Sequence, residues 1–195
     1  MIDPGDLSDG EIIGASLADP SLFEHIFRRH YRAVYRYGVR AAGRDDGADI
    51  AAEVFVRAFA GRHRFDVRYA SARPWLLGIA AHLVADLYRR LEREGRALGR
   101  LVGRPGERVE FEQAAADRLD AHASVEAIRN LLAGLRPEER DVVGLFALAD
   151  LSYQQIAEAL QIPVGSVKSR LSRARSHIRN LLGAIDEPIP DDSHG

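Results

Sequence analysis

Apolar residues recur along most of the chain at the three- and four-residue spacing of an α-helix. The alternation of apolar and polar residues that marks a strand is nearly absent. Asp19-Pro20 is a good helix start, with an acidic N-cap followed by proline at the first helical position. The stripe predicted to face a core comprises Phe23, Ile26, Phe27, Tyr31, Val34 and Tyr35. The pattern therefore predicts an all-α fold.

Two more helices are predicted in the N-terminal half. A glycine-containing break at 43–47 precedes a helix over about 48–60, and a loop over 62–72 precedes a long helix from Arg73-Pro74. The predicted inward residues are Ile50, Ala51, Val54, Phe55, Ala58, Leu76, Ile79, Ala80, Leu83 and Leu87. Asp49, Glu53 and Arg57 follow one another at i, i+4 and i+8 on the outer face.

The character of the chain changes after residue 94. Glycines and a proline interrupt residues 95–106, and helical patterning resumes at about residue 123. The tail, 185–195, contains acids and two prolines. We therefore expect two small helical domains, 15–94 and 122–184, joined by a flexible linker over 95–121 and followed by a disordered tail.

The second domain has the pattern of a helix-turn-helix. Pro137 opens a helix whose predicted core side shows Val142, Val143, Leu145, Phe146 and Leu148. Ser152 then caps a short helix over 153–160, a turn follows at 161–163, and a third helix begins near Val164. The small Ala157 suits the crossing of the two helices. Such a unit places its second helix in the major groove of DNA.

The charge of the predicted helix-turn-helix supports this interpretation, whereas the net charge of the whole chain does not. The formal net charge is only −2, but residues 152–182 hold five basic side chains and one acid, Glu158. The candidate DNA-contacting residues are Val164, Gly165, Ser166, Lys168, Ser169, Arg170, Ser172, Arg173 and Arg175. The plainer alternative is an amphipathic helix whose arginines are only solvated.

Several classes of site find no support in the sequence. The absence of cysteine excludes a disulfide framework, a thiolate zinc site and a cysteine nucleophile. His25 and His30 are five residues apart, which places them on different helix faces, and Glu138 and Glu139 suit the first turn of a helix. We expect no catalytic residues, metal or cofactor. The N-terminus lacks the pattern of a signal peptide and no apolar run is long enough for a membrane span, so we expect a cytoplasmic protein without membrane insertion.

The segment LSYQQIAEALQIPVGSVKSRLSRARSHI closely resembles region 4 of the extracytoplasmic-function (ECF) sigma factors. The upstream segment LRPEERDVV fits the same family. One departure is Gln161, where the family usually has glycine, so modest strain is expected in the turn.

The N-terminal half resembles region 2 of the same family through DDGADIAAEVFVRAF and RPWLLGIAAHLVADLYRR. The resemblance implies a polymerase-binding face formed by Asp49, Ile50, Glu53 and Arg57. It also implies −10 DNA contacts from Phe65, Tyr69, His82, Asp86, Arg89 and Arg90. Ala52 and Ala81-His82 depart from the family, which usually has glutamine and Arg-Asn there. Without the resemblance, the charged face is better explained as a solvated surface, because such faces are common. Phe65 and Tyr69 are core or site residues with similar weight, and core packing is favoured for Trp75.

The resemblance implies an alternative sigma factor that catalyses no reaction itself. Such a factor binds core RNA polymerase, directs it to promoter DNA through the −35 and −10 elements, helps melt the −10 region, and is commonly held inactive by an anti-sigma protein. Two alternatives remain at this point. One is a free-standing helix-turn-helix regulator, and the other is an interaction adaptor that sequesters a partner.

Overall fold

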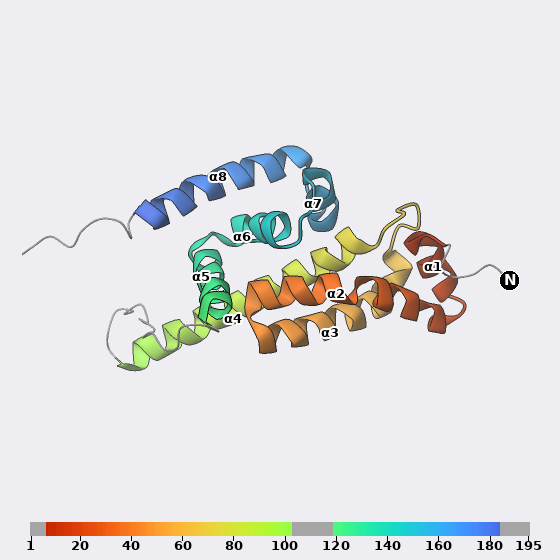
Figure 1. The fold of residues 1–195 in the computed structure, drawn as a ribbon, viewed down its shortest axis with the longest axis horizontal. Helices are drawn as coiled ribbons and strands as arrows, with labels where there is room; N and C mark the ends of the chain where they lie inside the picture. The colour runs from red at the N-terminus through yellow and green to blue at the C-terminus, as the bar shows by residue number, and fades with distance from the viewer. Residues whose placement is uncertain (1–6, 103–118, 184–195) are drawn as a thin grey trace, which may run out of the picture.

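The computed structural model describes residues 7–102 and 119–183, and within them every regular element is helical (Figure 1). The chain order is α1 (Asp9–Ser16), η1 (Pro20–Leu22), α2 (Phe23–Ala42), α3 (Arg44–Gly61), η2 (Arg62–Arg64), α4 (Arg73–Val102), α5 (Leu119–Gly134), α6 (Pro137–Val143), η3 (Gly144–Leu148), α7 (Tyr153–Leu160) and α8 (Val164–Gly183). The predicted all-α class is confirmed. The predicted tail, from residue 184 on, lies outside the described residues.

Helices α2, α3 and α4 form the core of the N-terminal unit. Gly43 adopts φ +89°, a conformation open to glycine, and turns the chain sharply from α2 into α3. The two helices then run so close together that a Cβ on Gly38 would lie 2.7 Å from the carbonyl oxygen of Gly47. All five residues predicted to point inward from α3 are buried. Gly47, expected to be part of the break, lies instead inside α3.

The start of α2 and part of its predicted core stripe differ from expectation. Asp19 caps the short turn η1, accepting a hydrogen bond from the Ser21 amide at 3.0 Å, and α2 proper begins at Phe23. Phe27 and Tyr31 were predicted to be core residues but are 41% and 38% exposed. They lie at the margin of the α2–α3 contact, where the Phe27 ring meets the edge of Phe55 at 4.8 Å between centroids.

The sequence interpretation missed the first helix, α1. Ser8 and Glu11 form a capping box in which the Glu11 amide donates to Ser8 Oγ at 3.3 Å and the Ser8 amide donates to Glu11 Oε2 at 2.8 Å. Ser-x-x-Glu is the usual sequence signature of such a box, so Ser8 and Glu11 could have predicted this helix start. Ile12 and Ile13 fix the helix by burial in the N-terminal core.

The predicted linker is shorter than expected at both ends. Helix α4 continues through Gly95 and Gly99 to Val102, and α5 begins at Leu119. A glycine inside an exposed helix costs only about 1 kcal/mol relative to alanine, and the leucines, arginines and alanine around these glycines favour helix. Residues 103–118, the rest of the predicted linker, lie outside the described residues.

The C-terminal unit contains the predicted helix-turn-helix. Ser152 caps α7 through a capping box with Gln155, and Gln161 turns the chain toward α8 in the left-handed conformation, with φ 55°. Phe146, predicted to be a core residue, is 41% exposed. Helix α6 ends at Val143 and passes into the π-helical turn η3, whose wider winding carries Phe146 off the α-helical stripe.

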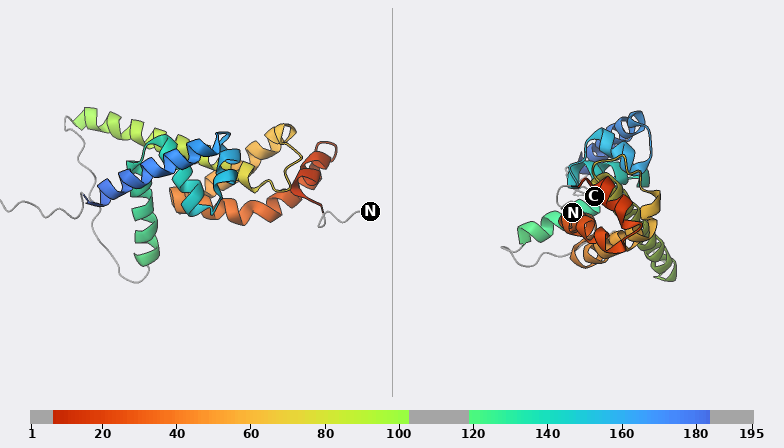
Figure 2. Two further views of the ribbon diagram at one scale, coloured as in Figure 1. Left: turned by 90° about the horizontal axis from the view of Figure 1, so that it is seen from above. Right: turned by 90° about the vertical axis from the view of Figure 1, so that its right-hand side faces the viewer.

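The two units pack directly against each other. Helix α7 lies on α4 so closely that a Cβ on Gly78 would be 2.3 Å from the Ala159 carbonyl oxygen. Arg73 and Arg40 donate to the carbonyl oxygens of Ala149 and Leu148, at 2.6 and 3.2 Å. The right-hand view of Figure 2 shows α6, α7 and α8 together on one side of the N-terminal bundle.

Arg140 is central to this contact between the units. Its side chain is almost completely buried and its Nε donates to the Leu132 carbonyl oxygen at 2.8 Å, at the end of α5. The guanidinium also lies 4.2 Å from the centre of the Tyr88 ring and 3.2 Å from Glu92 Oε1, both on α4. Arg140 thus joins α4, α5 and α6 with one side chain.

Candidate functional site

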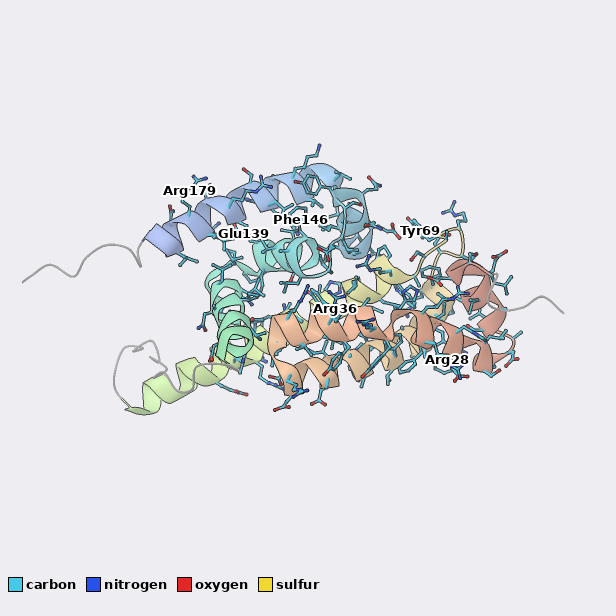
Figure 3. All side chains as sticks on the ribbon, viewed as in Figure 1. Arg28, Arg36, Tyr69, Glu139, Phe146 and Arg179 are labelled. Carbon is cyan, nitrogen blue, oxygen red and sulfur yellow. The ribbon has the colours of Figure 1, made fainter. Side chains whose placement is uncertain are left out.

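A groove of about 550 Å³ lies where the 65–72 loop meets α4 and α7. Its floor is aromatic: Phe65 is buried, with its ring 5.0 Å from that of Trp75. Tyr69 is 45% exposed and lies on the outer part of the loop (Figure 3). Of the predicted −10 residues, Phe65, Tyr69 and His82 line this groove together. An exposed ring beside a hollow of this size can stack on an unpaired base.

Charge shapes both walls of this groove. On the loop, Asp66 and Arg68 form an ion pair at 2.6 Å, and hydrogen bonds from Arg68 lower the pKa of Asp66 to about 2. The opposite wall comes from α7, through Glu158 and Gln161. Partial burial raises the pKa of Glu158. An acidic side chain of the C-terminal unit therefore stands at the edge of the groove.

A second groove, of about 750 Å³, lies along the junction of α3 and α4. The predicted polymerase contacts Asp49, Ile50, Glu53 and Arg57 line this groove. Three predicted −10 contacts, Asp86, Arg89 and Arg90, line it too. Most of the arginines already have partners along their own helix: Arg57 pairs with Glu53 at 2.7 Å, and Arg89 pairs with Asp86. The sequence assigned these two sets to different partners, whereas the structure places them on one surface.

The predicted −35 residues lie on α8, at the outer side of the molecule (Figure 1). The exposed ones are Gly165, Lys168, Ser169, Ser172, Arg173 and Arg175, whereas Val164, Ser166 and Arg170 are half-buried. Val167, Leu171 and Ala174 form the buried face of the same helix. In the described part of the chain, no carboxylate pairs with Lys168, Arg173 or Arg175. This face carries uncompensated positive charge, as phosphate binding requires.

Comparison with known proteins gives a family match for each half of the chain. Residues 26–94 match the family model described as sigma-70 region 2, and residues 125–178 match that described as sigma-70, region 4. ECF RNA polymerase sigma factor SigW of Bacillus subtilis is 30% identical over 171 residues, covering 84% of this chain and 90% of that protein. The chain belongs to the ECF RNA polymerase sigma factors. SigC of Mycobacterium tuberculosis, another ECF sigma factor, is 28% identical over 183 residues, covering 94% of this chain and 92% of SigC.

Two solved structures share the fold of this ECF sigma factor. CnrH, in complex with the cytosolic domain of CnrY, superposes with a TM-score of 0.64 at 23% identity, covering 92% of this chain and 99% of CnrH. The sigma factor RpoE of Bartonella quintana, in complex with the anti-sigma factor NepR, gives 0.53 at 22% identity, covering 85% and 98%. Between residues 7 and 102 and between 119 and 183, no helix is long and apolar enough to cross a membrane.

Sequence analysis missed the surroundings of two acids of region 4, the buried Glu139 and the half-buried Asp141. Glu139 was expected in the first turn of a helix and lies in that turn of α6. Its side chain is fully buried between α6 and α8, where Oε2 lies 2.7 Å from His177 Nδ1 (Figure 3). Burial raises the pKa of Asp141 to about 6, although His82, Arg140 and Arg170 oppose the shift. Neither had a signal in the sequence, because charged residues on a short helix are usually exposed.

Sequence analysis also missed Asp9, which is buried beneath the 65–72 loop. Its carboxylate accepts hydrogen bonds from His30 and from the Ala72 amide. Burial alone would raise the pKa of Asp9, but these hydrogen bonds and a third from Arg29 lower it to about 2. The described residues contain no group of three histidine, aspartate or glutamate side chains that could hold a metal ion.

Proposed function

We propose that this ECF sigma factor directs core RNA polymerase to promoters by binding the −35 element through α8 and the unpaired −10 strand through the groove beneath the 65–72 loop. The observation that carries the proposal is the exposed basic face of α8, on which Lys168, Arg173 and Arg175 have no acidic partner among the described residues. Major-groove binding by the second helix of a helix-turn-helix uses such a face. The factor supplies binding energy and no chemical step, and it acts in the cytoplasm.

Promoter melting then follows because the factor binds the separated −10 strand more tightly than the paired duplex. Stacking an unpaired base on an aromatic ring contributes about 1–3 kcal/mol, and this energy is gained only once the strands separate. Tyr69 offers the exposed ring, and Phe65, packed under Trp75, supports the loop from below. His82, on the α4 side of the groove, is exposed and can contact the strand as it passes.

The α3–α4 groove is our candidate polymerase interface. Asp49 and Arg57 are exposed, Glu53 is half-buried, and the lining of the groove alternates in charge, which suits a charged helical partner. Asp86, Arg89 and Arg90 lie on its α4 side, so they are placed to bridge polymerase and DNA. We also propose that an anti-sigma protein competes with core polymerase for binding to this factor. Another sigma factor, RpoE, forms a complex with the anti-sigma factor NepR.

Run-off transcription with bacterial core RNA polymerase, on DNA from upstream of the factor's own gene, tests the proposal. Defined transcripts that need both proteins are expected. Arg173→Ala should lower output from a promoter with an intact −35 element about tenfold, since one lost base or phosphate contact costs about 1–3 kcal/mol. Arg179→Ala is the matched control, because Arg179 is an exposed arginine six residues further along α8, on another face. Equal output from wild type and Arg173→Ala would contradict the assignment of α8.

Core binding is measured separately by co-elution and by fluorescence titration. Asp49→Arg places a repelling charge on the α3–α4 groove and is expected to weaken core binding at least tenfold. Asp45→Arg, on an exposed first-turn position of the same helix, makes the same charge change outside that groove and should leave binding within about twofold. Equal losses in both variants would mean that only net charge matters.

A further inference from the structure

Two hydrogen bonds made by Asp9 attach helix α1 to the backbone of the 65–72 loop. The Asp9 amide donates to the Ala70 carbonyl oxygen at 3.1 Å, and the Ala72 amide donates to Asp9 Oδ2 at 2.7 Å. These two bonds hold the end of the loop just before α4 begins. In Figure 1 the loop between α3 and α4 lies beside α1.

The carboxylate of Asp9 is buried and fully engaged. His30 Nε2 lies 2.6 Å from Oδ2, and Arg29 Nη1 donates to Oδ1 at 3.0 Å, so the residue ties the loop to α2 as well as to α1. Helix α1 does not need Asp9 for capping, because Ser8 and Glu11 already form the capping box. A buried carboxylate is retained only with such partners, and here one of them is the loop backbone.

Gly10 makes the second contact between α1 and the loop. A Cβ at this position would lie 2.1 Å from the Val67 carbonyl oxygen and 2.7 Å from the Tyr69 carbonyl oxygen. Only glycine permits α1 to lie this close to the middle of the loop. Gly14, one turn later, is different: its Cβ would meet only Val67 Cγ1, at an ordinary 3.5 Å.

We propose that α1 sets the shape of the 65–72 loop, and thereby the −10 base preference, with Asp9 and Gly10 as its positioning residues. The proposal rests on the proposed −10 function of the loop. Asp9 holds the Ala70–Ala72 end, and Gly10 holds the backbone on both sides of Arg68, next to the exposed Tyr69 ring. Both residues precede the segment 26–94 that matches sigma-70 region 2.

The test is in vitro transcription by holoenzyme from a promoter library randomised in the −10 and −35 elements, with sequencing of the transcribed templates. Gly10→Ala is expected to change the relative preference among bases at one or two adjacent −10 positions by about fivefold or more. Preferences in the −35 element should stay within about twofold. Gly14→Ala is the matched control, the same change on the same helix, and should leave both profiles as in wild type.

Asp9→Asn is a milder second variant, which guards against loss of folding in Gly10→Ala. The asparagine oxygen can still accept from Ala72, but its NH₂ group then faces the Arg29 donor, so a smaller change at the same −10 positions is expected. Faster amide exchange at Ala72, measured by NMR, should accompany it.

A uniform fall in output with an unchanged −10 profile in both variants would overturn the proposal, because α1 would then only stabilise region 2. An equal change of profile in Gly14→Ala would overturn it too. If the wild-type profile itself shows no preferred −10 base while −35 selection persists, the proposed −10 function fails, and this inference fails with it.

Discussion

At the scale of single residues, Gln161 occupies a position that suits glycine. It ends α7 in the left-handed conformation, with φ 55° and ψ 44°, which costs a side-chain-bearing residue about 1–2 kcal/mol. Gln161→Gly is therefore expected to raise the free energy of unfolding by about 0.5–1 kcal/mol, measured by urea denaturation. Gln154→Gly, at an exposed helical position of α7, should lower it by about 1 kcal/mol. A loss of stability in both variants would show that the Gln161 side chain outweighs its backbone strain.

Asp141 is expected to make the free energy of unfolding depend on pH. Burial raises its pKa to about 6, so the folded protein resists ionising this carboxyl, whereas the unfolded chain ionises it at about pH 4. The unfavourable contribution is absent below about pH 4 and grows as the pH rises to 6. Asp141→Asn should therefore match wild type at pH 4 and exceed its stability by about 1–3 kcal/mol at pH 7.

Urea titrations at several pH values between 4 and 8 measure this difference for Asp141→Asn. Asp45→Asn, an exposed position on α3, is the control and should give a curve parallel to wild type. A stability gain that is constant across the whole pH range would contradict the titration of Asp141. In that case the asparagine would be acting through packing alone.

At the scale of helices, the sequence predicted an element correctly wherever a single periodic apolar face determines how that helix packs. The inward residues of α3, the Ser152 cap and the start of α4 were all predicted, because local patterning and tertiary packing agree there. Helix α1 was missed because its eight residues show little periodicity, although its capping box was visible. The exposure of Phe27 could not be predicted, since it depends on how far the contact between α2 and α3 extends. The exposure of Phe146 could not be predicted either, since it depends on the π-helical turn η3.

The same limit applies to the candidate site. The α8 face follows from spacing and charge, so its residues could be named from the sequence. The two grooves arise where separate elements meet, which is why Phe65 and Asp86 were grouped together but line different surfaces. Asp9 and Asp141 act through partners far away in the chain, and no local pattern indicates such contacts.

The hairpin of α2 and α3 gives a prediction at this scale. A Cβ on Gly47 would lie 2.5 Å from the Val39 backbone nitrogen, so Gly47→Ala must push the two helices apart and is expected to cost about 1–3 kcal/mol in thermal unfolding. Gly61→Ala places the same methyl group at the end of α3, with no atom within 4 Å, and should be neutral or slightly stabilising. Equal melting temperatures for the two variants would show that the hairpin adapts without strain.

At the scale of the whole molecule, region 4 packs on region 2, and we expect this packing to limit access of DNA to the proposed −10 groove. Helix α7 lies on α4 and places Glu158 at the edge of the groove that holds Tyr69 and His82. The two promoter elements are about two helical turns apart, roughly 70 Å. Two units in direct contact cannot easily reach both elements, so we expect them to separate in the transcribing complex. The contact is also partly polar, as transient interfaces between domains usually are.

The Gly78–Ala159 contact allows this separation to be tested. The side chain in Gly78→Val would clash with the α7 backbone, since its Cβ would lie 2.3 Å from the Ala159 carbonyl oxygen, and it should shift the free protein toward an open form. The expected results are a larger radius of gyration by small-angle X-ray scattering and tighter binding of a single-stranded −10 oligonucleotide without polymerase. Gly95→Ala, on the same helix with no atom within 4 Å, should change neither. If Gly78→Val lowers stability but leaves the radius unchanged, the two units do not separate at the contact between α4 and α7.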